Sequence, residues 1–96
     1  MIPTRAIVIH PDDDVAVVVQ DVAQGGSVAA ESSAGTQQIL ATQPIPTGHK
    51  IALRSIPAGL PVRKYGEKIG HAIQDIHAGD HVHLHNLASD RVKSAG

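Results

Sequence analysis

The segment HVHLHN places three histidines at alternating positions, His81, His83 and His85. If the segment is a strand, alternation puts the three imidazoles on one face and Val82 and Leu84 on the other. Residues two apart on a strand are separated by roughly 6.5–7 Å, so an adjacent pair can reach one divalent ion, whereas all three need a bend. A solvent-facing polar row beside buried aliphatic residues is the alternative. The residues alone leave both interpretations open.

Two further segments carry side chains that could take part in chemistry. In TGHKIAL, His49 and Lys50 follow the turn glycine Gly48. A histidine in a turn could act as a base or a metal ligand, and a lysine could bind a substrate carboxylate; a hairpin with ordinary surface charge is the alternative. In RKYGEKIG, Lys64 stands beside Tyr65, the sole aromatic residue of the chain. For Tyr65 we expect a place in the core, with its hydroxyl at the surface.

The composition limits what can position these side chains. The chain has 96 residues, which is the length of one small domain, 1–96. Aromatic residues make up 1 %, so the core must consist of Val, Ile, Leu and Ala. Valine and isoleucine favour strands. Because such a core gains little from burial, we expect docking against another chain, or a homo-oligomer.

Charge and composition also exclude classes of function. A net charge of -1 with scattered Lys and Arg argues against nucleic acid as a partner. Without cysteine, disulfides and thiolate metal sites are impossible, which fits a reducing cytoplasm. The longest aliphatic run, Val15–Val19, is too short to span a membrane, and the N-terminus lacks the layout of a signal peptide. We expect a soluble cytoplasmic protein with no membrane partner.

The N-terminal third of the chain predicts a strand followed by a helix. RAIVIH predicts a strand over 5–10, and the acidic run Asp12–Asp14 follows it. Apolar spacings of three and four predict a short helix over about 13–24, capped by the acidic residues and ended by a glycine. A strand over 15–19 is the competing interpretation, because valine weakens helix propensity.

A turn pattern then recurs four times. An aliphatic residue, two others, a glycine, two others and a second aliphatic residue follow one another at 22–28, 45–51, 56–62 and 76–82. This pattern predicts tight turns whose glycines have positive φ, each leading into a short strand. The polar stretch 31–38 predicts a mobile loop or a hairpin tip. The expected fold is therefore mainly β, with bent strands and one short helix.

Four motifs in this order, DDDVAVVV, IPTGHKIAL, VRKYGEKIG and IHAGDHVHLHN, resemble the small N-terminal domain of the altronate and galactarate dehydratase family. This domain belongs to the SAF group, and the resemblance covers about residues 6–91. It implies a SAF-like β-clip. In that family the domain is fused to a large catalytic domain or made as a separate small subunit, as in sulfolactate sulfo-lyase. Because the chain ends at residue 96, we expect the separate form.

The resemblance also implies an activity, a lyase that eliminates water from a sugar acid with the help of a divalent metal, iron being the expected one. The metal would be held by His49, His83 and His85, the same histidines also being candidates for base or general acid. The lysines would face the substrate carboxylate, and Asn86 would orient the histidines. The expected site residues are thus His49, Lys50, Lys64, His83, His85 and Asn86.

The same resemblance implies a partner, a large catalytic lyase subunit without which the chain would be inactive. Two alternatives stay open. The chain could be the small subunit of sulfolactate sulfo-lyase, which would eliminate sulfite. It could also be a SAF module that binds carbohydrate or serves as an accessory domain without catalysis.

Overall fold

The computed structural model describes residues 3–89, and these residues form nine strands and no helix. The described part of the chain therefore contains no helix that could cross a membrane. A six-stranded sheet has the order β4-β3-β1-β2-β5-β8, and a three-stranded sheet has the order β6-β7-β9. The strands are β1 (Thr4–Ile7), β2 (Val15–Val18), β3 (Ser27–Ser32), β4 (Gly35–Leu40), β5 (Lys50–Ala52), β6 (Pro61–Lys64), β7 (Glu67–Ala72), β8 (His81–Val82) and β9 (Leu87–Ser89).

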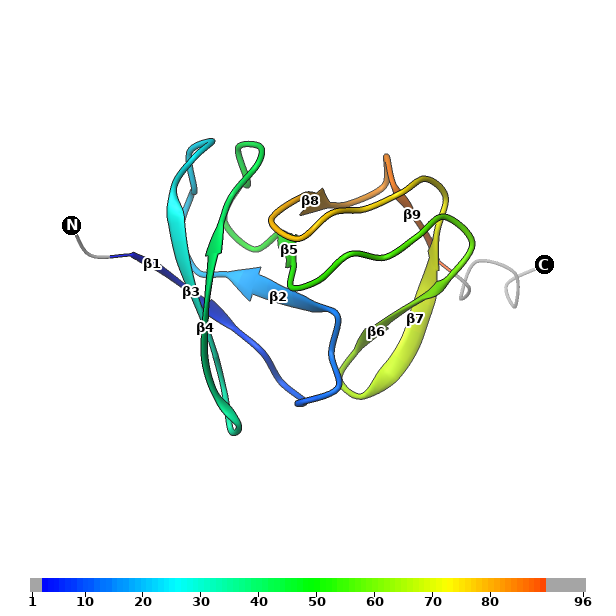
Figure 1. Ribbon diagram of the computed structural model, residues 1–96, viewed down its shortest axis with the longest axis horizontal. Helices are drawn as coiled ribbons and strands as arrows, with labels where there is room; N and C mark the ends of the chain where they lie inside the picture. Colours follow the sequence, from blue (N-terminus) through cyan, green and yellow to red (C-terminus); the bar gives the residue numbers. More distant parts are fainter. Residues whose placement is uncertain (1–2, 90–96) are drawn as a thin grey trace.

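Two hairpins, β3–β4 and β6–β7, lie at opposite ends of the molecule, with β2 and β5 between them (Figure 1). The expected mainly β fold of short, bent strands is confirmed. The segment 31–38 forms the tip of the β3–β4 hairpin, where Ser32 pairs with Gly35. Of the two interpretations of that segment, the hairpin tip is the one observed.

The helix expected over 13–24 is wrong, because β2 occupies the start of that segment. Ala16 and Val18 pack into one hydrophobic core, whereas Val15 packs into a second core on the other side of the strand. The sequence of a strand that is buried on both faces is a continuous apolar run. Such a run also contains apolar residues at the spacings of three and four that are typical of a helix. The β-branched valines fit such a strand better than a helix.

The four turn units form two pairs. Val22 and Ile45 exchange two backbone hydrogen bonds of 2.9 Å, and Ile56 pairs with Ile76 in the same way. The glycine of each unit has positive φ, between 83° and 92°, as expected. The last residue of each unit is a fully buried aliphatic residue near the start of a strand. These residues are Val28, Ile51, Val62 and Val82.

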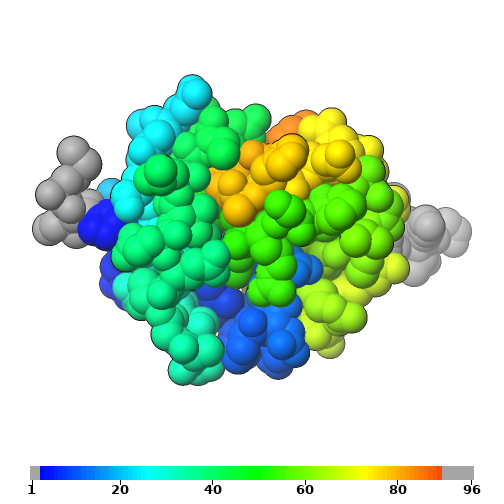
Figure 2. Space-filling view, in the orientation of Figure 1, coloured from blue at the N-terminus to red at the C-terminus, as the bar shows by residue number. Residues whose placement is uncertain are grey.

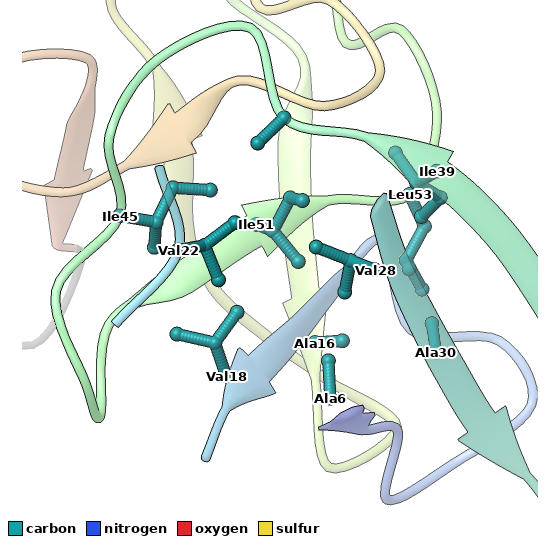
Figure 3. Close-up of a cluster of buried hydrophobic side chains, with 11 residues drawn as sticks. Ala6, Ala16, Val18, Val22, Val28, Ala30, Ile39, Ile45, Ile51 and Leu53 are labelled. Carbon is teal, nitrogen blue, oxygen red and sulfur yellow. The ribbon is translucent and has the colours of Figure 1, made fainter. Parts of the chain in front are cut away.

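Aliphatic side chains fill both cores. Figure 3 shows the first core, in which Val22, Ile45 and Ile51 lie close together. The second core lies between β2, β5 and the three-stranded sheet, and it contains Val15, Ala52, Ile56, Val62, Ala72, Ile76 and Val82. On the surface, the segments that carry Ile56 and Ile76 run side by side across the middle of the molecule (Figure 2). The two cores thus join the sheets into one body, which brings residues of β5, β6 and β8 close together.

Candidate active site

Three histidines from two segments gather beside β5. His49 lies between the turn glycine Gly48 and β5, and His81 opens β8, which pairs antiparallel with β5. Nδ1 of His49 and Nε2 of His81 are 2.8 Å apart. The ring centroids of His49 and His83 are 4.2 Å apart. One ring nitrogen from each of the three histidines lies within 4.8 Å of the others.

A turn after β8 brings His83 to this cluster. The strand ends at Val82 instead of continuing to residue 85, because the backbone N–H groups of Asn86 and Leu87 both donate to the carbonyl of His83. The buried Asn86 side chain fixes the turn, since its Oδ1 accepts from the N–H of His83 and its Nδ2 donates to the carbonyl of His81. Leu84, expected on a buried face, is 80 % exposed because alternation stops at the turn.

This turn is the bend that three histidines need to meet one ion. The group that it forms is His49, His81 and His83. The ring centroid of His85 lies 5.3 Å from that of His81, and His85 is outside the group of three. The sequence indicated that the row of alternating histidines could bind a metal. It did not show which two histidines of the row would lie close to His49.

The electrostatic environment suits metal binding. Burial lowers the pKa of both His81 and His83, and the neighbouring imidazoles and Lys50 lower it further. These rings are therefore neutral at pH 7, with a lone pair available. With metal–nitrogen bonds of about 2.1 Å, two nitrogens on one ion are at most about 4.2 Å apart. Since the observed nitrogens lie within 4.8 Å, a small rotation of the rings makes the cluster fit a divalent ion.

Two lysines lie beside this cluster, across the junction of the two sheets. Lys50 of β5 and Lys64 of β6 line a pocket of about 290 Å³. Burial lowers the pKa of Lys50, and the charge of Lys64 lowers it further. Two close ammonium groups above apolar walls attract an anion such as a carboxylate. The other lining residues are Tyr65, Ile69, His83, Leu84, Leu87 and Ser89, so His83 belongs to both the pocket and the histidine cluster.

The expected place of Tyr65 in the core is wrong. Tyr65 and Gly66 form the two-residue turn between β6 and β7, and the Tyr65 side chain is 58 % exposed. Both residues have positive φ, 60° and 73°, which is typical of a type I′ turn. The Nζ atom of Lys64 lies 3.5 Å from the centroid of the tyrosine ring. Because the turn places the ring at the end of the hairpin, the ring lines the pocket instead of lying in the core.

One aspartate holds this turn in place. Asp13, expected to cap a helix, is fully buried, and its Oδ1 accepts from the N–H of Gly66 at 2.8 Å. Its Oδ2 accepts from the N–H groups of Tyr65 and His10, each at 3.1 Å. Sequence reasoning missed this role. The available signal was an aspartate shortly after a proline, which is typical of turns as well as of helix starts.

Known proteins are similar to this chain in sequence. Residues 4–90 match the family described as the altronate/galactarate dehydratase SAF domain. Over 88 % of its length, the chain is 45 % identical to altronate dehydratase of Escherichia coli and 41 % identical to that of Bacillus subtilis. It spans 16 % of the length of each of those relatives. It is also 36 % identical to (2R)-sulfolactate sulfo-lyase subunit alpha of Chromohalobacter salexigens, covering 94 % of that protein.

Proposed function

The chain belongs to the altronate/galactarate dehydratase SAF domain family, and we propose that it is the small subunit of a two-chain lyase that eliminates water from a sugar acid. The likeness to altronate dehydratases supports dehydration, and the likeness to a subunit alpha over most of its length supports a separate small subunit. The observation that carries the proposal is the cluster of three imidazoles beside a pocket with two lysines.

In this proposal His49, His81 and His83 hold a divalent ion such as iron, which would supply Lewis-acid activation of the leaving hydroxyl. Lys50 and Lys64 bind the substrate carboxylate. Their charges also stabilise the negative charge that develops on the carboxylate when the neighbouring carbon loses its proton. His85, at the exposed side of the cluster, is the candidate general acid, and Asn86 holds the histidine turn in position.

A large catalytic subunit supplies the rest of the active site in this proposal, since the chain spans 16 % of the altronate dehydratases that it matches. The chain itself acts as a single SAF domain, residues 1–96, in the cytoplasm, and it is inactive alone. Cell fractionation tests the location. A purified chain that turned over substrate alone would contradict the need for a partner.

Elimination of sulfite from sulfolactate is the second candidate function. The observation in its favour is that the chain covers 94 % of a sulfo-lyase subunit alpha but a small share of the dehydratases. The same lysines and histidines would serve, because both reactions remove a proton beside a carboxylate and expel a group from the neighbouring carbon.

The deciding experiment purifies the chain from its native cells with the proteins bound to it, then assays the complex with altronate, galactarate and sulfolactate. Release of water from a sugar acid supports the first function, and release of sulfite supports the second. The variants His83→Ala and Lys64→Ala should lose activity while keeping the partner, with His77→Ala, an exposed histidine, as the matched control. A chain that recovers no large subunit, or whose complex eliminates nothing, would instead favour a non-catalytic binding module.

A further inference from the structure

Tyr65 occupies a position that packing and backbone preference do not explain. It is the sole aromatic residue of the chain, yet its side chain is mostly exposed. Its φ of 60° is uncommon for any residue with a side chain and is an outlier for a bulky one. Asparagine, aspartate or glycine would suit the first position of this turn better. Residues held in such conformations cluster at functional sites.

The surroundings hold the tyrosine backbone firmly. The buried carboxylate of Asp13 accepts hydrogen bonds from both residues of the turn. A Cβ atom at Gly66 would come within 2.8 Å of the His10 ring, so the turn is also closely packed on that side. The ring of Tyr65 is therefore carried by a fixed backbone at the edge of the pocket.

The environment of the phenol eases its ionisation. The pKa of Tyr65 is lowered chiefly by Lys64, whose ammonium group lies over the tyrosine ring, and more weakly by the charge of Lys50. The carboxylate of Asp13 acts in the opposite direction. His83, on the same pocket, and His10, beside Gly66, are the other titratable groups nearby. A phenolate beside two ammonium groups is a suitable proton acceptor.

We propose that Tyr65 is the catalytic base of the elimination, facing the substrate across the pocket from the histidine cluster. The inference rests on the proposed function for its substrate, a hydroxy carboxylate. It answers a question that the proposed function leaves open, because histidines that hold an ion have no free lone pair at that nitrogen and the lysines are needed as cations.

The reaction balances with the groups named. The phenolate oxygen of Tyr65 takes the proton from the carbon next to the carboxylate, and the electron pair of that C–H bond forms a C=C bond. The C–O bond at the neighbouring carbon breaks, and the hydroxyl leaves with its electron pair, takes a proton from His85 and departs as water, after which His85 regains a proton from solvent. Tyr65 then returns its proton to solvent, so the net products are the enol and water.

The first test exploits the composition of the chain. With one tyrosine and no tryptophan, the near-ultraviolet absorbance of phenolate reports on Tyr65 alone. In the isolated chain, Tyr65 should titrate below the ordinary value of 10.0. The variant Lys64→Met should move the midpoint upward, whereas Lys68→Met, on the same hairpin, should leave it unchanged. A wild-type midpoint at or above the ordinary value, unmoved by Lys64→Met, would overturn the proposal.

The second test uses the assembled enzyme. Tyr65→Phe, which keeps the ring beside Lys64, should lower kcat by about a hundred-fold or more, with KM changed by a few-fold at most. The melting temperature and the affinity for the metal should match those of the wild type. If the wild-type complex is active and the Tyr65→Phe complex is equally active, this inference is overturned and the proposed function stands. A wild-type complex that eliminates nothing from any hydroxy acid would overturn both.

Discussion

At the scale of single residues, the proposed metal site depends on two histidines whose pKa is lowered. His81 and His83 are partly buried and lie close to other imidazoles and to Lys50, and each of these neighbours disfavours the charged form. Neutral imidazoles are good ligands for borderline divalent metals. The alternating row of histidines does not show which of them can share one ion. The positions of the rings do, because they bring His81 into the group with His49 and leave His85 outside it.

We therefore expect His81→Ala to weaken metal binding more than His85→Ala does. Losing one of three ligands should lower the affinity by about ten-fold or more, whereas losing a neighbour outside the group should have an effect of a few-fold at most. Calorimetric titration of the purified chain with Zn²⁺ measures both, with His77→Ala as the control. Equal losses in the His81 and His85 variants would contradict this assignment.

The same lowered pKa values predict how stability depends on pH. In the metal-free chain, His81 takes up a proton more readily when unfolded, at the ordinary value of 6.5, than when folded. Its contribution to stability is therefore present above that pH and is lost as the pH falls below it.

Thermal unfolding in the presence of a chelator, from about pH 7.5 to about pH 5, checks this expectation. The wild type should lose more stability on acidification than His81→Gln, in which the titrating group is gone. If the two curves stay parallel over the whole range, the pKa of His81 is not lowered by folding.

At the scale of elements, the turns position the functional side chains. Lys64 and Tyr65 stand at the end of the β6–β7 hairpin, and Asp13 fixes that turn by accepting from its two backbone N–H groups, while a third hydrogen bond comes from the N–H of His10. Removing a buried carboxylate leaves those donors without an acceptor, and each unsatisfied buried donor costs free energy. Asp13 is thus part of the support of the pocket.

The expected consequence is that Asp13→Ala lowers the free energy of unfolding by about 3 kcal/mol or more. Its neighbour Asp12, whose side chain is 79 % exposed, is the matched control, and Asp12→Ala should change stability by at most about 0.5 kcal/mol. Urea denaturation of the two variants and the wild type gives the comparison. Similar small losses in both would show that the turn does not need the buried carboxylate.

A second pair of variants tests the turn units. Gly59 and Gly79 have nearly the same positive φ, but a Cβ atom would meet nothing at Gly59 and would lie 2.2 Å from the Leu40 carbonyl oxygen at Gly79. Gly59→Ala should therefore cost about 1 kcal/mol for the backbone conformation alone. Gly79→Ala adds a backbone clash and should cost about 3 kcal/mol or more. Denaturant midpoints measure the difference, and equal costs would contradict the close approach at Gly79.

At the scale of the whole molecule, the pocket exists because two sheets meet. Lys50 comes from the six-stranded sheet and Lys64 from the three-stranded sheet, and the shared second core fixes the distance between them. The charge of Lys64 disfavours the charged form of Lys50, so their approach is maintained by the fold. An anion between them would relieve this repulsion.

A hydroxy carboxylate should therefore stabilise the folded chain. At ten times its dissociation constant, a ligand that binds the folded state alone adds about 1.4 kcal/mol to the free energy of unfolding. Malate is a suitable probe in thermal unfolding, with sodium chloride at the same ionic strength as the control. Lys50→Met should abolish the difference between malate and chloride. A wild-type chain that responds to both alike would show that the two lysines do not form a carboxylate site.

The sequence by itself determined the local structure. Turn glycines, short aliphatic strands and the mainly β fold follow from residue types within a few positions of one another, and the four motifs were enough to indicate the family. The helix over 13–24 failed because burial on both faces of β2 depends on distant segments, and local spacing cannot show it.

Only the tertiary structure decided which side chains meet. His49 reaches His81 across 32 residues, and Asp13 reaches Tyr65 across 52. Such contacts depend on how the turn units pair and how the two sheets pack around shared cores. Spacing along the chain carries no record of that packing, which is why the sequence identified the reactive residue types and the fold selected the particular residues that form the site.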